Sequence, residues 1–153
     1  MKYIFIQLIL LIFFVSPMNL FARTKAEVIK TLGLVEGKYE AKLEKPENSI
    51  DDFCENQSLE VNIVDIENSL SLVIGEKSYP GLEKNVIENK ENKKCPYKFT
   101  NKIEKNKLTH KLEYSCLKNQ NSESEFFFSN NKIEQIKKLN GTTQKCIYMN
   151  LKK

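Results

Sequence analysis

Few residues of this 153-residue sequence have side chains suited to catalysis or metal binding. His110 is the only histidine, so the chain cannot supply the two or three imidazoles of a typical zinc site. The acidic pair Asp51-Asp52 lacks the carboxylate spacing of a calcium loop. No Gly-x-Ser-x-Gly motif, which could mark a nucleophile for the histidine to activate, is present. We therefore predict no catalytic residue, no metal ion and no cofactor.

The four cysteines could in principle do redox or metal chemistry, but their spacing favours structural disulfides. No CxxC pair is present, and none has a histidine nearby in the manner of a zinc ligand set. All four follow residues 1–22, which have the pattern of a secretory signal peptide: Lys2, an apolar run from Tyr3 to Val15, and a small residue, Ala22, at the predicted cleavage site. Export to an oxidising compartment, either the periplasm or the cell exterior, allows disulfides to persist.

A β-hairpin register decides the cysteine pairing. Residues on both sides of a turn at 105–106 alternate between apolar and polar, as strands with one buried face do. An antiparallel hairpin centred on that turn places Cys95 opposite Cys116 on the apolar face. We therefore predict a Cys95–Cys116 disulfide, which leaves Cys54 and Cys146 to pair by elimination.

The same register gives the candidate ligand contacts. His110 lies on the apolar face of its strand, opposite Asn101, and Tyr97 lies opposite Tyr114. A polar pair on an apolar face is typical of a ligand pocket, where a few polar groups orient the ligand. The alternative is that His110 lies near the hairpin tip, where the core meets solvent and a polar residue is tolerated.

Three consecutive aromatic residues offer a different kind of site. Phe126, Phe127 and Phe128 place rings on both faces of a predicted strand, and only one face can serve the core. An exposed ring would mark a surface that binds a protein partner. The alternative is burial on both sides, beneath an N-terminal helix.

The rest of the sequence indicates the elements that hold these residues. A capping-box pattern from Thr24 to Glu27 predicts a short N-terminal helix ending at Gly33. After Gly37 the apolar period changes to two, and turn signals recur at short intervals. We predict an all-β antiparallel meander of about eight or nine strands over a single domain, residues 23–153. A barrel is the favoured architecture, with a sandwich as the alternative.

The order of elements resembles a lipocalin-type barrel. The resemblance comprises a short helix, then the Gly-x-aromatic pattern Gly37-Lys38-Tyr39 at the start of the first strand, then the meander. It implies an interior cavity for an apolar ligand.

Charge excludes some partners and leaves three functions open. Lys and Arg total 24 against 20 Asp and Glu, a mixed surface that is unlike a nucleic-acid footprint. The apolar run from Tyr3 to Val15 is shorter than a membrane-spanning helix needs, and no other apolar run approaches that length, so we expect no anchor after cleavage. We predict an exported, non-catalytic protein that binds a small apolar ligand. The alternatives are a protein-interaction module, such as an inhibitor or an envelope accessory protein, and an exported hydrolase whose paired carboxylates meet only in the fold.

Overall fold

The computed structural model describes residues 22–44, 58–89, 94–117 and 120–151. The predicted signal peptide, apart from its last residue, lies outside this part of the chain, and so does Cys54. Within the described ranges, no helix has the length and apolar character needed to span a bilayer.

The described residues form one helix and one antiparallel sheet of ten strands, which confirms the predicted all-β meander with its N-terminal helix. The elements in chain order are α1 (Lys25–Leu32), β1 (Gly37–Glu44), β2 (Ser58–Ile66), β3 (Ser69–Ile74), β4 (Lys77–Tyr79), β5 (Val86–Asn89), β6 (Tyr97–Glu104), β7 (Lys107–Tyr114), β8 (Ser122–Ser129), β9 (Lys132–Leu139) and β10 (Thr142–Asn150).

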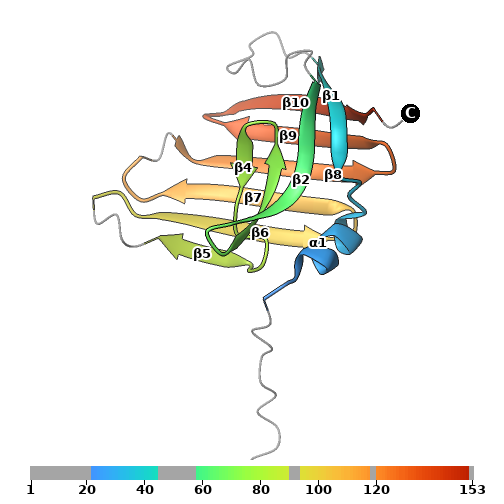
Figure 1. Cartoon of the computed structure of the whole chain (residues 1–153). Helices are drawn as coiled ribbons and strands as arrows, with labels where there is room; N and C mark the ends of the chain where they lie inside the picture. Colours follow the sequence, from blue (N-terminus) through green and yellow to red (C-terminus); the bar gives the residue numbers. More distant parts are fainter. Residues whose placement is uncertain (1–21, 45–57, 90–93, 118–119, 152–153) are drawn as a thin grey trace, which may run out of the picture.

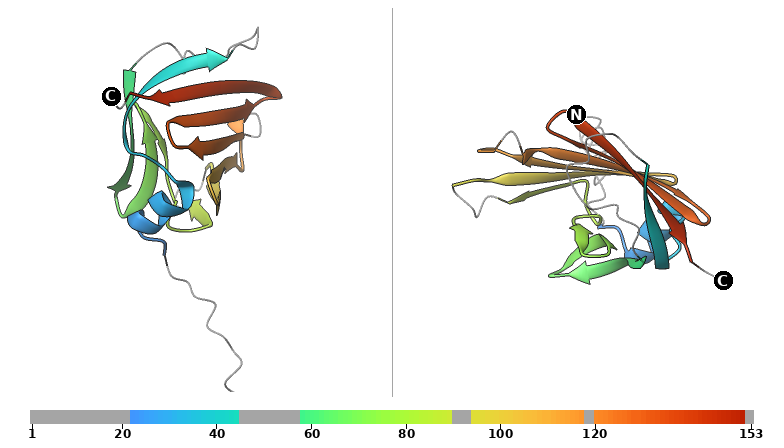
Figure 2. Two further views of the ribbon diagram at one scale, coloured as in Figure 1. Left: turned by 90° about the vertical axis from the view of Figure 1, so that its right-hand side faces the viewer. Right: turned by 90° about the horizontal axis from the view of Figure 1, so that it is seen from above.

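The sheet curls into a half-barrel (Figure 1). Its strand order is β4-β3-β2-β1-β10-β9-β8-β7-β6-β5, so the first and last long strands pair in the middle and β4 and β5 are the two edges. Figure 2 shows β2–β4 facing the broad surface of β6–β10 across the interior. Residues 80–85 connect the two edges, since they join β4 to β5. The interior is therefore bounded on this side by a connecting loop in place of paired strands.

The predicted register of the hairpin centred on residues 105–106 is correct. Cα partners in β6 and β7 include Tyr97 with Tyr114 and Asn101 with His110. In the β2–β3 hairpin, Ile63 pairs with Leu72. Alternation of apolar and polar residues decides such registers, because a slip by one residue would turn every side chain to the wrong face.

The N-terminal helix also forms as its caps predict. Thr24 accepts a hydrogen bond from the backbone N–H of Glu27, whose carboxylate accepts one from the N–H of Thr24 in return. Gly33 ends the helix in the left-handed conformation, φ 62°. Val28 and Leu32 are fully buried against the sheet, so the helix covers one end of the interior (Figure 2).

The strand count exceeds the prediction because of β4. The sequence Tyr79-Pro80-Gly81 indicates a turn, and the residues from Leu82 to Ile87 predict a short edge strand after it. In the structure a three-residue strand ends at Tyr79, Leu82 is buried in a turn, and the edge strand begins only at Val86. Three residues are too few to display a period of two, which is why the pattern does not reveal β4.

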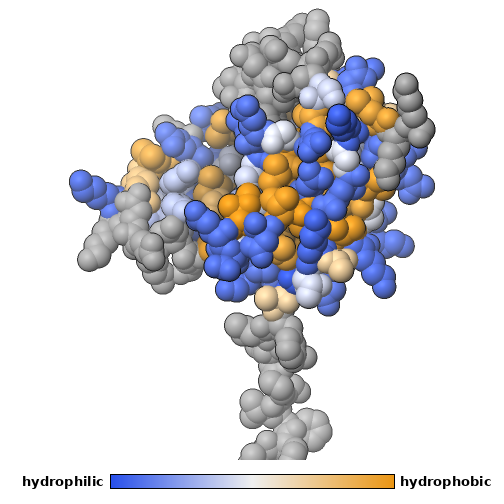
Figure 3. Space-filling view, viewed as in Figure 1, coloured by the Kyte–Doolittle hydropathy of each residue, from blue (hydrophilic) through white to orange (hydrophobic). Residues whose placement is uncertain are grey.

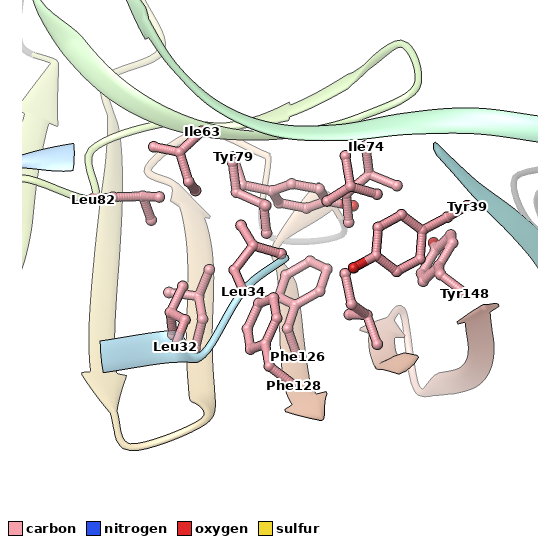
Figure 4. Packing of buried hydrophobic residues seen from close by; sticks show 14 of the residues in the cluster. Leu32, Leu34, Tyr39, Ile63, Ile74, Tyr79, Leu82, Phe126, Phe128 and Tyr148 are labelled. Atoms are coloured by element: carbon pink, nitrogen blue, oxygen red, sulfur yellow. The ribbon is translucent and has the colours of Figure 1, made fainter. Parts of the chain in front are cut away.

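The core fills the helix end of the half-barrel. In Figure 4, Phe126 and Phe128 lie among Leu32, Leu34 and residues contributed by β2–β4. Further along, Tyr39 and Tyr148 lie side by side, and both are almost completely buried. Buried side chains therefore occupy this end of the interior.

The outer surface mixes both charge signs with apolar residues. Lysines and glutamates form ion pairs across the convex face of the sheet, for example Lys107 with Glu125 at 2.5 Å and Lys145 with Glu134 at 3.4 Å. Figure 3 shows hydrophilic residues around one face and apolar residues toward its centre, over β2–β4. Pairs at the surface of the sheet add little stability individually but keep its face hydrated.

Candidate functional site

A groove of about 380 Å³ lies between edge strand β4 and the concave face of β6–β9. This volume is near the lower end of the roughly 300–1,000 Å³ range of small-molecule pockets. The residues that line it are Lys77, Ser78, Tyr79, Pro80, Phe99, His110, Leu112, Ser122, Ser124 and Lys137. None of these described lining residues is a carboxylate, so the paired acids of a hydrolase are not among them.

A row of polar side chains crosses the concave face beneath the groove. Strand pairing aligns Asn101, His110, Ser124, Lys137 and Gln144 as successive neighbours on β6 through β10. The adjacent row toward the helix is largely apolar and belongs to the core. The polar row therefore separates the packed end of the interior from the groove.

His110 is held in one orientation by Asn101, which is itself clamped by the edge-connecting loop. The Asn101 amide nitrogen donates to the carbonyls of Pro80 at 3.0 Å and Gly81 at 2.8 Å. Both of its hydrogens are thus used, and its oxygen lies 2.8 Å from His110 Nδ1. Asn101 is 1% exposed and His110 5%.

This arrangement determines the protonation of the imidazole. Since the Asn101 oxygen can only accept, His110 Nδ1 must carry the hydrogen. Burial lowers the pKa of His110 from 6.5 to about 4, so the ring is neutral at pH 7 and Nε2 holds a lone pair. In the described part of the chain, Nε2 has no hydrogen-bond donor. His110 therefore contributes an acceptor to the groove.

Aromatic rings flank the imidazole. Tyr79 meets it edge-on, with ring centroids 5.4 Å apart and an interplanar angle of 83°. Phe99 lies tilted at 5.3 Å on β6. These rings leave a groove whose walls suit a flat apolar group.

A second polar network holds the Tyr79 side chain, which lines the groove. Gln135 is fully buried, and its amide nitrogen donates to the Tyr79 hydroxyl at 2.8 Å and to Ser124 Oγ at 3.4 Å. Its oxygen accepts from the Tyr148 hydroxyl at 2.6 Å. Burial raises the pKa of Tyr148, so that hydroxyl stays protonated. Since Tyr79 comes from β4 and Gln135 from β9, the network ties the edge strand across the interior.

The predicted ligand contacts divide into two groups. His110 lines the groove, and Asn101 lies behind it as its positioning residue. Tyr97 and Tyr114 form a tilted pair with centroids 5.9 Å apart, next to Phe99 and outside the groove lining. They lie at the end of the hairpin where Cys95 and Cys116 are joined.

The disulfide follows the predicted pairing in part. Cys95 and Cys116 are bonded, with Cα atoms 5.2 Å apart. Cys146 is also disulfide-bonded, while its predicted partner Cys54 lies outside the described residues. Within those residues no group of three or more His, Cys, Asp or Glu side chains is placed to hold a metal ion.

The three phenylalanines do not form one exposed surface. Phe126 and Phe128 are buried in the core, at 0% and 4% exposure, while Phe127 on the opposite face is 37% exposed. The Lys107 ammonium lies 4.9 Å from the Phe127 ring centroid and partly covers it. A partner surface on β8 would thus rest on Phe127 alone.

Sequence reasoning missed several groove residues. Alternation places Phe99 and Leu112 on the same face as His110, so hairpin parity could have identified both. Ser122, Ser124 and Lys137 belong to that face too, but only the pairing of β7, β8 and β9 aligns them with His110. Nothing in the local sequence around Tyr79 indicates that it crosses the interior.

Comparison with known proteins gives similarity to solved structures alone. No family model matches this sequence, and no curated protein matches it. Among solved structures, the chain is similar to the crystal structure of secretory abundant heat soluble protein 4 from Ramazzottius varieornatus. The sequence identity is 15%, the match covers 76% of this chain and 94% of that chain, and the TM-score is 0.47. We therefore infer function from the groove residues themselves.

Proposed function

We propose that this chain is an exported, non-catalytic protein that binds a small, largely apolar ligand in the groove between β4 and β6–β9. The observation that carries the proposal is a cavity of about 380 Å³ at a position where the interior is not filled by core side chains. Tyr79, Pro80, Phe99 and Leu112 give it apolar wall, and two of its polar groups, His110 and Ser124, are held in place by Asn101 and Gln135, as in small-molecule sites generally.

Three further observations support the proposal. The polar row would be expensive to bury under a solid core, whereas a ligand or solvent can complete its hydrogen bonds. The resemblance of Gly37-Lys38-Tyr39 and the following meander to lipocalin-type barrels indicates the same kind of interior site. The Cys95–Cys116 disulfide is compatible with export to an oxidising compartment.

A substitution that fills the groove with a large side chain tests this function directly. The chain has no tryptophan, so Ser122→Trp would introduce both bulk in the groove and a single fluorescent reporter. Glu123→Trp is the matched control, because adjacent residues of a strand point to opposite faces. The probe is the neutral dye N-phenyl-1-naphthylamine, whose fluorescence rises on entering an apolar site.

We expect saturable dye binding by the wild type and the control, and at least tenfold weaker binding by Ser122→Trp. Native mass spectrometry of the exported protein provides a second measurement, since a retained ligand would add a few hundred daltons to the native mass only. No saturable dye binding by the wild type, together with an unliganded native mass, would contradict the proposed function.

A further inference from the structure

We infer that the groove selects uncharged ligands that present a hydroxyl group on a flat aromatic body, with the hydroxyl donating to His110 Nε2. This inference rests on the proposed function, and it assigns the chemical class of the ligand that the groove would take.

The first step is the direction of the hydrogen bond at the groove floor. The Asn101 oxygen occupies Nδ1 at 2.8 Å, and the two Asn101 hydrogens are held by the Pro80 and Gly81 carbonyls. The amide therefore cannot flip to present a donor to the ring. Consequently Nε2 is the acceptor, and among the described residues no protein group donates to it.

The second step concerns the charge of the ligand. A carboxylate brings only acceptors, so it would place lone pairs against the lone pair of Nε2. Protonating the ring to accommodate a carboxylate is unfavourable, because His110 is buried and no acidic residue lines the groove in the described part of the chain. Lys77 and Lys137 also line the groove, yet both already engage other groups. A neutral hydroxyl can donate the hydrogen bond that His110 Nε2 accepts at the floor of the groove.

The third step is the shape of the ligand. Tyr79 and Phe99 flank the imidazole with centroids 5.4 and 5.3 Å from it, which leaves aromatic surface on both sides of the acceptor. An aromatic ring bearing the hydroxyl can stack or pack edge-on against these rings. Ser122 adds a hydroxyl that can either donate or accept near the same floor. A phenol or other aryl alcohol combines all these features.

Three matched probes distinguish the alternatives: 2-naphthol, 2-methoxynaphthalene and 2-naphthoate. They share one ring system and differ in offering a donor, only an acceptor, or a negative charge. Binding is measured by titration of the purified protein. The imidazole nitrogens are followed by long-range ¹H–¹⁵N NMR, in which the only histidine of the chain gives a single pair of resonances.

We expect 2-naphthol to bind about two- to tenfold more tightly than its methyl ether, the range for one hydrogen bond. Only 2-naphthol should move the Nε2 resonance toward that of a hydrogen-bonded nitrogen. In His110→Leu the preference over the ether should disappear, while Thr109→Val, on the opposite face of β7, should retain it.

The outcomes separate this inference from the proposed function. Equal binding of 2-naphthol and its ether with an unmoved Nε2 would overturn the donor preference and leave groove binding intact. Tightest binding of 2-naphthoate would also overturn it, and would assign the selectivity to the lysines. If none of the probes binds or perturbs the groove, both the inference and the proposed function fail.

Discussion

His110 should make the stability of this protein depend on pH between 7.5 and 5. The folded ring has a pKa of about 4 because of burial, while in the unfolded chain the pKa returns to the ordinary 6.5. Between these values the unfolded state binds a proton that the folded state does not. The free energy of unfolding therefore falls as the pH is lowered through this window, and recovers as the pH rises.

The magnitude follows from the two pKa values. Each unit of pKa difference corresponds to about 1.4 kcal/mol, so the loss of stability at pH 5 relative to pH 7.5 is about 2 kcal/mol. No other side chain with an ordinary pKa titrates in this range, since His110 is the only histidine. Below pH 5 the carboxylates contribute as well: hydrogen bonds from lysines hold the pKa values of Glu125 and Glu134 below normal, so their stabilisation is lost there.

Urea denaturation at pH 7.5, 6.5, 5.5 and 5.0 measures the effect, with the NMR titration of the single imidazole as a direct check. The control is His110→Gln, which keeps a polar neutral side chain but removes the titrating group. We expect this variant to be less stable overall and to change little between pH 7.5 and 5. A wild-type change below about 0.5 kcal/mol, or an equal change in the variant, would refute the reasoning.

The remaining predictions concern the hydrogen bonds from Asn101 to the edge-connecting loop and the Cys95–Cys116 disulfide. A Cβ at Gly81, φ 84°, would lie 2.9 Å from the Asn101 amide nitrogen, so Gly81→Ala should lower the free energy of unfolding by about 1–3 kcal/mol in urea denaturation. Gly141→Ala, at φ 78° with open space around it, measures the backbone strain alone and should be less harmful. Asn101→Leu should raise the exchange rate of loop amides, followed by hydrogen exchange, because two buried carbonyls lose their donor. Reducing Cys95–Cys116 or replacing both residues by serine should lower stability by at most about 3.4 kcal/mol, since the bond closes a short loop of the unfolded chain. Unchanged denaturation midpoints would contradict the predictions for Gly81→Ala and for the disulfide, and unchanged exchange rates would contradict the prediction for Asn101→Leu.

The hairpins and the helix could be predicted because their information is local. In β6–β7, a turn and alternating side chains fix the register, and the register alone fixes the Cys95–Cys116 bond. The helix needs only Thr24, Glu27 and Gly33 at its ends. Each of these features depends on residues a short distance apart, where spacing in the sequence is nearly the same as spacing in space.

The position of the groove could not be predicted because it depends on contacts that are distant in sequence. Tyr79 reaches Gln135 across the interior, 56 residues away, and β1 pairs with β10 although most of the chain separates them. Local alternation says which face a side chain lies on, but it says nothing about which strand faces which across the half-barrel. Tyr97 and Tyr114 illustrate this limit, since both are on the concave face yet lie outside the groove lining.

The polar row explains why the half-barrel remains open at one end. His110 and Ser124 are already buried, and apolar side chains packed over them would leave their remaining hydrogen-bonding groups without partners. Asn101 accepts a hydrogen bond from His110 Nδ1, and Gln135 donates one to Ser124 Oγ. Asn101 also holds the edge-connecting loop in place, and Gln135 holds β4. The same amides that stabilise the open edges thus position the groups that face the groove. Substitutions that weaken binding through these amides should therefore also loosen the edges, whereas Ser122, which faces the groove, should affect binding alone.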